Sequence, residues 1–108
     1  MKLQHQDLIN SGRWAKMSFC EQMANIGSEV SRALNWRKKD KPDLSEKAIL
    51  RALELLWFTI ELARKYPARL KELCRVREVL IDYFFCDNEY GSSEILWRKY
   101  FDYFVLVK

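Results

Sequence analysis

The chain has 108 residues, which is enough for one domain and too few for two. Hydrophobic residues make up 49% and charged residues 31%, a balance that excludes an intrinsically disordered chain and an integral membrane protein. The formal net charge is +4, and the basic excess lies in residues 1–41, which hold eight basic and four acidic side chains. Only three Gly and two Pro occur, which favours a few long elements over many short ones.

The first twelve residues are polar and lack the apolar stretch of a signal peptide. We therefore expect residues 1–12 to be a polar N-terminal extension and residues 13–108 to form the domain. The longest charge-free apolar run, residues 55–60, is far shorter than the roughly 20 residues that cross a bilayer. These features predict a cytoplasmic protein without a membrane partner.

The cysteines agree with a reducing compartment. Cys20, Cys74 and Cys86 are odd in number, far apart and set among apolar neighbours, so we expect each to be a small core residue. No C-x-x-C motif is present and the one histidine, His5, lies in the polar extension. The sequence therefore predicts no metal site and no cofactor.

The first predicted helix covers about residues 18–37. Ser18 and Glu21 have the spacing of a capping box, in which each side chain bonds the other's backbone N–H. Apolar residues then recur every third or fourth position, which is typical of an amphipathic helix. A seam of small residues around Gly27 lies beside this stripe and would let a neighbouring element approach closely.

The second helix is predicted over about residues 44–65, with Asp43 as its cap and Tyr66-Pro67 as its end. It is apolar nearly all the way round at mid-length, where Trp57 and Phe58 broaden the main stripe. Such a helix is sandwiched between neighbours or covered by another subunit.

Two more helices follow, over about residues 68–86 and 93–107. The polar segment 87–91 between them, which ends in Gly91, predicts a turn, and Ser92 or Ser93 can cap the last helix. Similar lengths and short connections favour antiparallel packing. The sequence therefore predicts an all-α fold, a single-domain up-and-down bundle of four helices.

A sequence signature lies in Phe19–Val30, continues through Arg32, Ala33 and Trp36, and includes residues 51–56, 70–73 and Asp82–Tyr90. These stretches resemble a set of small uncharacterised all-helical prokaryotic proteins. The resemblance covers about residues 13–105 and implies a single helical domain. It implies no activity and transfers no functional residue.

The aromatic C-terminal segment is the first candidate site. Its aromatic side chains occupy more than one helix face, so one face can pack on the bundle while another meets a partner. Together with the second helix, it supplies these candidate interface residues: Trp57, Trp97, Tyr100, Phe101, Tyr103 and Phe104.

The basic loop is the second candidate. Cationic side chains there can hold phosphates while an indole stacks on a base, although four phosphate contacts make only a weak binder. The alternative interpretation is a solvated connection between helices. The candidate nucleic-acid contacts are Trp36, Arg37, Lys38, Lys39 and Lys41.

A polar ridge on the first helix is the third candidate. Asn25, Glu29 and Arg32 follow steps of four and three and form a patch that is either a site or an ordinary exposed face. An acid–base or metal site could in principle use the carboxylates on the long helices, but both E-x-x-H motifs of such bundles are missing. The carboxylates concerned are Glu29, Glu54, Glu61, Glu78 and Asp82.

Taken together, these features favour a non-enzymatic role over an enzymatic one. The leading hypothesis is a helical protein–protein interaction module that self-associates, as a dimer first of all, or binds another protein. A weak nucleic-acid binder using residues 37–41 and a bundle enzyme with a carboxylate site remain the alternatives.

Overall fold

The computed structural model describes residues 12–107, which contain five helices and no strand, so the predicted all-α class is confirmed. The predicted extension, residues 1–12 with His5, lies outside the described residues except for Gly12. The helices are α2 (Arg13–Lys16), α3 (Phe19–Lys38), α4 (Pro42–Leu62), α5 (Pro67–Phe85) and α6 (Glu94–Leu106). The four long helices correspond to the four predicted ones, and α2 is an additional single turn.

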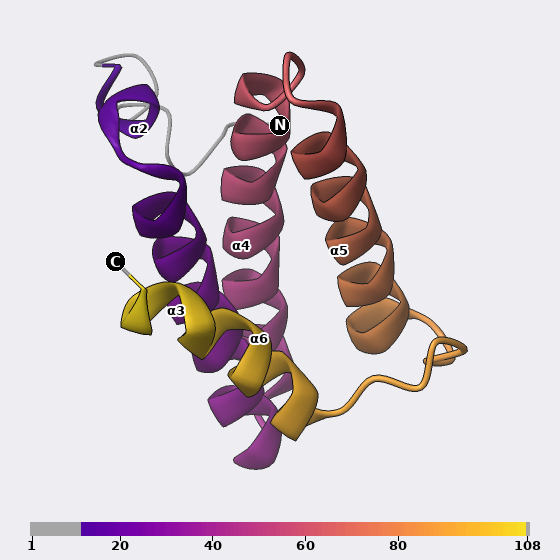
Figure 1. Ribbon diagram of the computed structural model, residues 1–108. Coiled ribbons are helices and arrows are strands. Elements are labelled where there is room, and N and C mark those ends of the chain that lie inside the picture. Colours follow the sequence, from indigo (N-terminus) through magenta and orange to yellow (C-terminus); the bar gives the residue numbers. More distant parts are fainter. Residues whose placement is uncertain (1–11, 108) are drawn as a thin grey trace.

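The long helices reverse direction one after another, and the last lies at an angle to the rest. Figure 1 shows α3 and α4 side by side and antiparallel, α5 returning along α4, and α6 crossing obliquely over α3. α3 packs along both α4 and α6, and α4 packs along α5, whereas α5 and α6 barely approach each other. Three pairs of neighbouring long helices therefore pack together, and the fourth pair, α5 and α6, leaves a gap between its helices.

Side-chain caps start two of the helices where the sequence predicts them. The Ser18 hydroxyl accepts a hydrogen bond from the Glu21 backbone N–H at 3.1 Å, and Ser93 accepts from Leu96 at 3.2 Å. The expected Asp43 cap is wrong, because α4 begins earlier, at Pro42, with no side-chain cap. Pro suits the first turn because its missing N–H has no helical partner there.

The turns also follow the sequence, with one shifted boundary. α4 ends at Leu62 rather than near residue 65, and Pro67 opens α5. In the predicted turn before α6, Asn88 (φ 55°) and Gly91 (φ 66°) adopt left-handed conformations that these two residue types tolerate best. The buried carboxylate of Asp82 fixes this loop, accepting the backbone N–H groups of Glu89 and Tyr90 at 3.0 Å each.

The core lies where the predicted apolar stripes meet. Its members come from every described helix, and the stripes of the three longest helices account for most of them. Removal of this apolar surface from water is the main term that stabilises the fold. Among the fully buried large side chains are Met23, Ile26, Val30, Ile49, Leu56, Leu73 and Leu80.

A buried contact that the sequence did not predict fastens α2 to the bundle. Trp14 is only 2% exposed, and its indole N–H donates to the Thr59 hydroxyl on α4 at 3.0 Å. The Gln22 amide donates to the Trp14 carbonyl at 2.8 Å. Gln22 is therefore buried although it is polar, because its amide satisfies a carbonyl at the end of α2.

The cysteines divide between core and surface. Cys20 and Cys74 are half-buried beside the core, but Cys86 is exposed at the end of α5, so the expectation that all three are core residues is wrong for Cys86. All three are free thiols.

Candidate interaction surface

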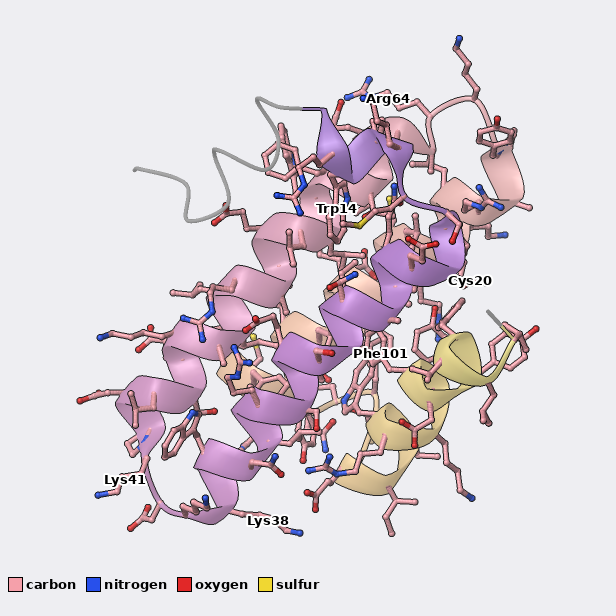
Figure 2. The ribbon with its side chains drawn as sticks, turned by 90° about the vertical axis from the view of Figure 1, so that its left-hand side faces the viewer. Trp14, Cys20, Lys38, Lys41, Arg64 and Phe101 are labelled. Carbon is pink, nitrogen blue, oxygen red and sulfur yellow. The ribbon has the colours of Figure 1, made fainter. Side chains whose placement is uncertain are left out.

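The inner face of α6 is sunk into the bundle against a glycine. Trp97, Phe101 and Phe104 are each 5% exposed, and in Figure 2 Phe101 lies between α3 and α6. A Cβ built on Gly27 of α3 would stand 2.7 Å from the Phe101 Cβ, which is closer than real Cβ contacts come. The predicted small-residue seam therefore exists, and its close neighbour is the ring of Phe101.

Aromatic contacts complete this seam. The ring of Phe104 meets Phe19 edge to face at 5.8 Å, and Trp97 stacks near Phe101 at 6.2 Å. These geometries are the ones that aromatic pairs prefer. Three of the predicted interface residues, Trp97, Phe101 and Phe104, are thus part of the core within one chain, because α3 already covers them.

A polar latch runs beside the aromatic seam. The Arg98 guanidinium donates to the Ser31 hydroxyl and to the Asn35 side-chain oxygen, both at 2.8 Å, and to Glu94 at 3.0 Å. Lys38 approaches the same Glu94 carboxylate at 3.4 Å. The hydrogen bond from Arg98 lowers the pKa of Glu94 below its ordinary value, with a smaller contribution from Lys38.

On its other side, α6 faces α5 across an apolar groove of about 340 Å³. Val76 and Val79 of α5 line one wall, and Leu96 and Tyr100 of α6 line the other. The volume falls within the range of ordinary ligand pockets. The groove lies between α5 and α6, the two long helices that pack least closely against each other.

One polar contact spans this groove. The Tyr100 hydroxyl donates to the Glu72 carboxylate at 2.8 Å. Burial raises the pKa of the Tyr100 phenol well above its ordinary value, and the hydrogen bond to Glu72 raises it further. The indole N–H of the neighbouring Trp97 is buried and finds no acceptor within residues 12–107.

The outer face of α6 carries a set of large apolar side chains in water. Their exposed fractions run from 47% to 85%, and all of them lie on α6 or at its C-cap. They flank the exposed charges of Lys99 and Asp102, and exposed apolar surface gathered on one helix is typical of an interaction site. The set consists of Ile95, Leu96, Tyr103, Val105, Leu106 and Val107.

The remaining predicted interface residues fall in different places. Tyr103 is 59% exposed and belongs to the outer face of α6, while Tyr100 is half-buried in the groove. Trp57 is 48% exposed on α4, where it packs edge to face on Phe58 at 5.0 Å, and it is not among the residues that line the groove. The structure therefore brings Tyr100 and Tyr103 to one surface and leaves Trp57 on another.

Two cations of the predicted basic loop, Arg37 and Lys38, belong instead to the last turn of α3 and are already engaged within the chain. Arg37 lies over the Tyr83 ring at 4.8 Å and donates to the Tyr83 backbone carbonyl at 3.3 Å, near the C-terminal end of α5. Cations stabilise a helix there because the exposed carbonyls carry partial negative charge. Lys38 is paired with Glu94, as described above.

The other members of the basic loop are more open to solvent. The Lys39 ammonium lies 5.3 Å from the centre of the half-buried Trp36 indole, so that ring already has a cation on it. Lys41 is exposed, and Figure 2 shows it with Lys38 at the end of the molecule opposite Trp14. Nothing in the structure tests contact with nucleic acid, which stays a prediction.

The polar ridge of α3 connects two helices. Glu29 accepts from Arg32 on its own helix and from Arg51 on α4, both at 3.0 Å, and its side chain is largely shielded from water. The Asn25 amide donates to the Glu21 backbone carbonyl at 2.8 Å. The structure thus gives Glu29 the role of a link between α3 and α4.

The other carboxylates considered for chemistry are dispersed. Glu61 binds Arg64 through two hydrogen bonds, Asp82 holds the loop before α6, and Glu78 accepts from the Tyr90 hydroxyl at 3.3 Å. Within residues 12–107, no three His, Cys, Asp or Glu side chains gather closely enough to hold a metal ion.

Comparison of this chain with known protein families, with curated proteins and with solved structures finds no match. In the described part of the chain, no helix has both the length and the apolarity needed to cross a membrane.

Proposed function

We propose that this chain is a helical protein–protein interaction module that associates with a second copy of itself through α6. The observation that carries the proposal is that α6 has large apolar side chains on its outer face as well as on its inner face. The inner face is covered by α3, whereas the outer face leaves Ile95, Leu96 and Leu106 more than half exposed. An amphipathic surface helix needs only the inner face, so the outer apolar side chains are left for a partner.

The groove between α5 and α6 also supports the proposal, because it adjoins the outer face of α6. Leu96 belongs to both the groove and the outer face, so the two form one continuous apolar region. Tyr103, in the same region, combines an apolar ring with a polar hydroxyl, which suits interfaces that form and separate in water. The resemblance noted in the sequence implies no activity, so the proposal rests on this surface alone.

We place the module in the cytoplasm as part of the same proposal. Its three cysteines are unpaired and odd in number, and thiols stay reduced in the cytosol. Immunodetection after cell fractionation tests this location, and recovery in an oxidising compartment would contradict it.

Self-association is measured by sedimentation equilibrium of the whole chain from about 5 to 500 μM. We expect a concentration-dependent rise in average mass, with dissociation constants in the micromolar range typical of small interfaces. Leu106→Glu places a charge at the most exposed apolar position and should abolish the rise.

Leu50→Glu is the matched control, because Leu50 is an exposed leucine on α4, away from the proposed surface. Its mass profile should follow that of the unchanged chain, and circular dichroism should show that both variants remain helical. A chain that stays monomeric over the whole concentration range, or an equal effect of the two substitutions, would overturn the proposal.

A further inference from the structure

We propose that the two copies pair antiparallel along their α6 helices, with Lys99 of each chain facing the partner's Asp102. This inference rests on the proposed function, because it supplies the register of the self-association. The observation behind it is the order of residues along the outermost line of α6.

That line consists of four residues at successive steps of four, three and four: Ile95, Lys99, Asp102 and Leu106. Such spacing keeps side chains on one face of a helix. The line runs opposite the buried rings of Trp97, Phe101 and Phe104, and all four of its members are exposed. These four residues are the part of α6 that points farthest from the bundle, and so they lie nearest to a second helix packed against it.

The order of these residues is self-complementary. Ile95 lies as far before the middle of the line as Leu106 lies after it, and the same holds for Lys99 and Asp102. A two-fold axis through the middle of the line therefore sets Ile95 against the partner's Leu106 and Lys99 against the partner's Asp102, each pair occurring twice. The central charges attract and the outer apolar side chains cover each other.

A parallel arrangement in the same register lacks this complementarity. It would set Lys99 against the partner's Lys99 and Asp102 against the partner's Asp102, and like charges facing each other are unfavourable. The four-three-four spacing is that of coiled-coil seams in general, so it suits helix pairing and leaves the direction to the charges. Charge complementarity thus selects both the partner, a second copy, and its direction.

The two charges are available for this pairing. Neither Lys99 nor Asp102 forms an ion pair with any residue between 12 and 107. Beside the line, the two-fold axis keeps each flank on its own side, so Leu96 comes close to the partner's Tyr103 and this flank is apolar as well. A helix of 13 residues is only about 20 Å long, and the interface is accordingly small and its dimer weak.

The test uses the whole chain and exchanges the two charges. In Lys99→Asp, two attractions become two repulsions between carboxylates, and in Asp102→Lys they become two repulsions between ammonium groups. Each variant should raise the dissociation constant of the dimer about tenfold or more at low salt. The double variant K99D/D102K exchanges the partners and should restore the dissociation constant to within a few-fold of the original.

Mixing the two single variants gives the most specific readout. In a heterodimer of K99D with D102K, the introduced aspartate of one chain faces the introduced lysine of the other. At the second contact the native Asp102 faces the native Lys99, so both attractions return. Sedimentation of the mixture should therefore show tighter association than either variant alone. Lys47→Asp, at an exposed lysine on α4, controls for the change in net charge and should leave the dissociation constant unchanged.

The outcomes separate the register from the proposed function. If Leu106→Glu abolishes the dimer but K99D, D102K and their mixture all behave like the unchanged chain, the antiparallel register is overturned while self-association through α6 stands. If the unchanged chain remains monomeric up to the highest concentration, the proposed function and this inference fail together. Weakening by each single variant with recovery in the mixture supports the inference.

Discussion

α6 packs closely against α3 but only loosely against α5. Toward α3 it is sealed: Phe101 fits against Gly27, and Arg98 bonds to Ser31. Toward α5 it leaves an apolar groove spanned by a single hydrogen bond within the described residues, from Tyr100 to Glu72. The same helix thus packs closely along one edge, where Gly27 admits Phe101, and leaves accessible surface along the other.

Truncation of the ring on the sealed side should have the largest effect. We expect Phe101→Ala to lower the free energy of unfolding by about 3–5 kcal/mol, because it removes buried apolar area and leaves a cavity against Gly27. Urea denaturation at low micromolar concentration measures this. Tyr103→Ala, on the exposed face of the same helix, should change it by less than about 0.5 kcal/mol, and comparable losses would break the comparison.

Substitution of Gly27 on α3 tests the close packing between α3 and α6 from the other side of the contact. Gly27→Ala gains about 1 kcal/mol of helix propensity but forces a new Cβ into the Phe101 ring, which costs about 1–3 kcal/mol. We expect a net loss of unfolding free energy in the same denaturation assay. In a Phe101→Ala background the contacts with the ring disappear but the 2.7 Å contact with the Cβ of residue 101 remains, so the same substitution should still destabilise the chain, by less than in the unchanged background. A gain in the unchanged background would contradict the close packing.

Substitutions on the side of α6 that faces α5 should change the free energy of unfolding only slightly. Tyr100→Phe removes the hydrogen bond to the exposed carboxylate of Glu72 and keeps the ring, so we expect a loss of about 0.5–1 kcal/mol. Tyr103→Phe is the matched control, since its exposed hydroxyl makes no hydrogen bond seen among residues 12–107 and its stability should not change. A loss from Tyr100→Phe as large as that from Phe101→Ala would mean that α5 holds α6 as firmly as α3 does.

The smallest effect concerns pH. The hydrogen bond from Arg98 lowers the folded-state pKa of Glu94 from its ordinary value of 4.5, so ionised Glu94 stabilises the folded chain. This contribution is fully present above about pH 4.5 and is lost as the pH falls through the lowered value. Glu94→Gln should remove that part of the acid dependence seen in thermal melts, and an unchanged acid profile would refute the latch.

The sequence predicted the fold because its local signals agree with one another. The stripes, the caps at Ser18 and Ser93 and the turn at Gly91 all concern residues within a few positions of each other. It missed what depends on distant residues. Trp14 became core because Thr59, far along the chain, offers its hydroxyl, and nothing near Trp14 signals that partner.

The candidate site was predicted in part for the same reason. Periodicity places apolar residues on faces, but it cannot say which aromatic face of α6 meets α3. In the structure Phe101 lies against Gly27, Trp97 and Phe104 are buried with it, and Tyr103 stays outside. Periodicity alone also gives no reason to single out Lys99 and Asp102, because charged residues on an amphipathic helix are ordinarily solvated.

Because α6 is synthesised after α3, the surface around Gly27 that Phe101 covers is exposed in the growing chain. Translation adds about 5–20 residues per second, whereas small helical elements form in microseconds. The stretch from Cys86 to Val107 therefore takes roughly one to four seconds to synthesise after α5 is complete. During that interval the backbone at Gly27 and the apolar side of α3 lack the cover that α6 provides, and transiently exposed apolar surface of this kind favours aggregation of a nascent chain.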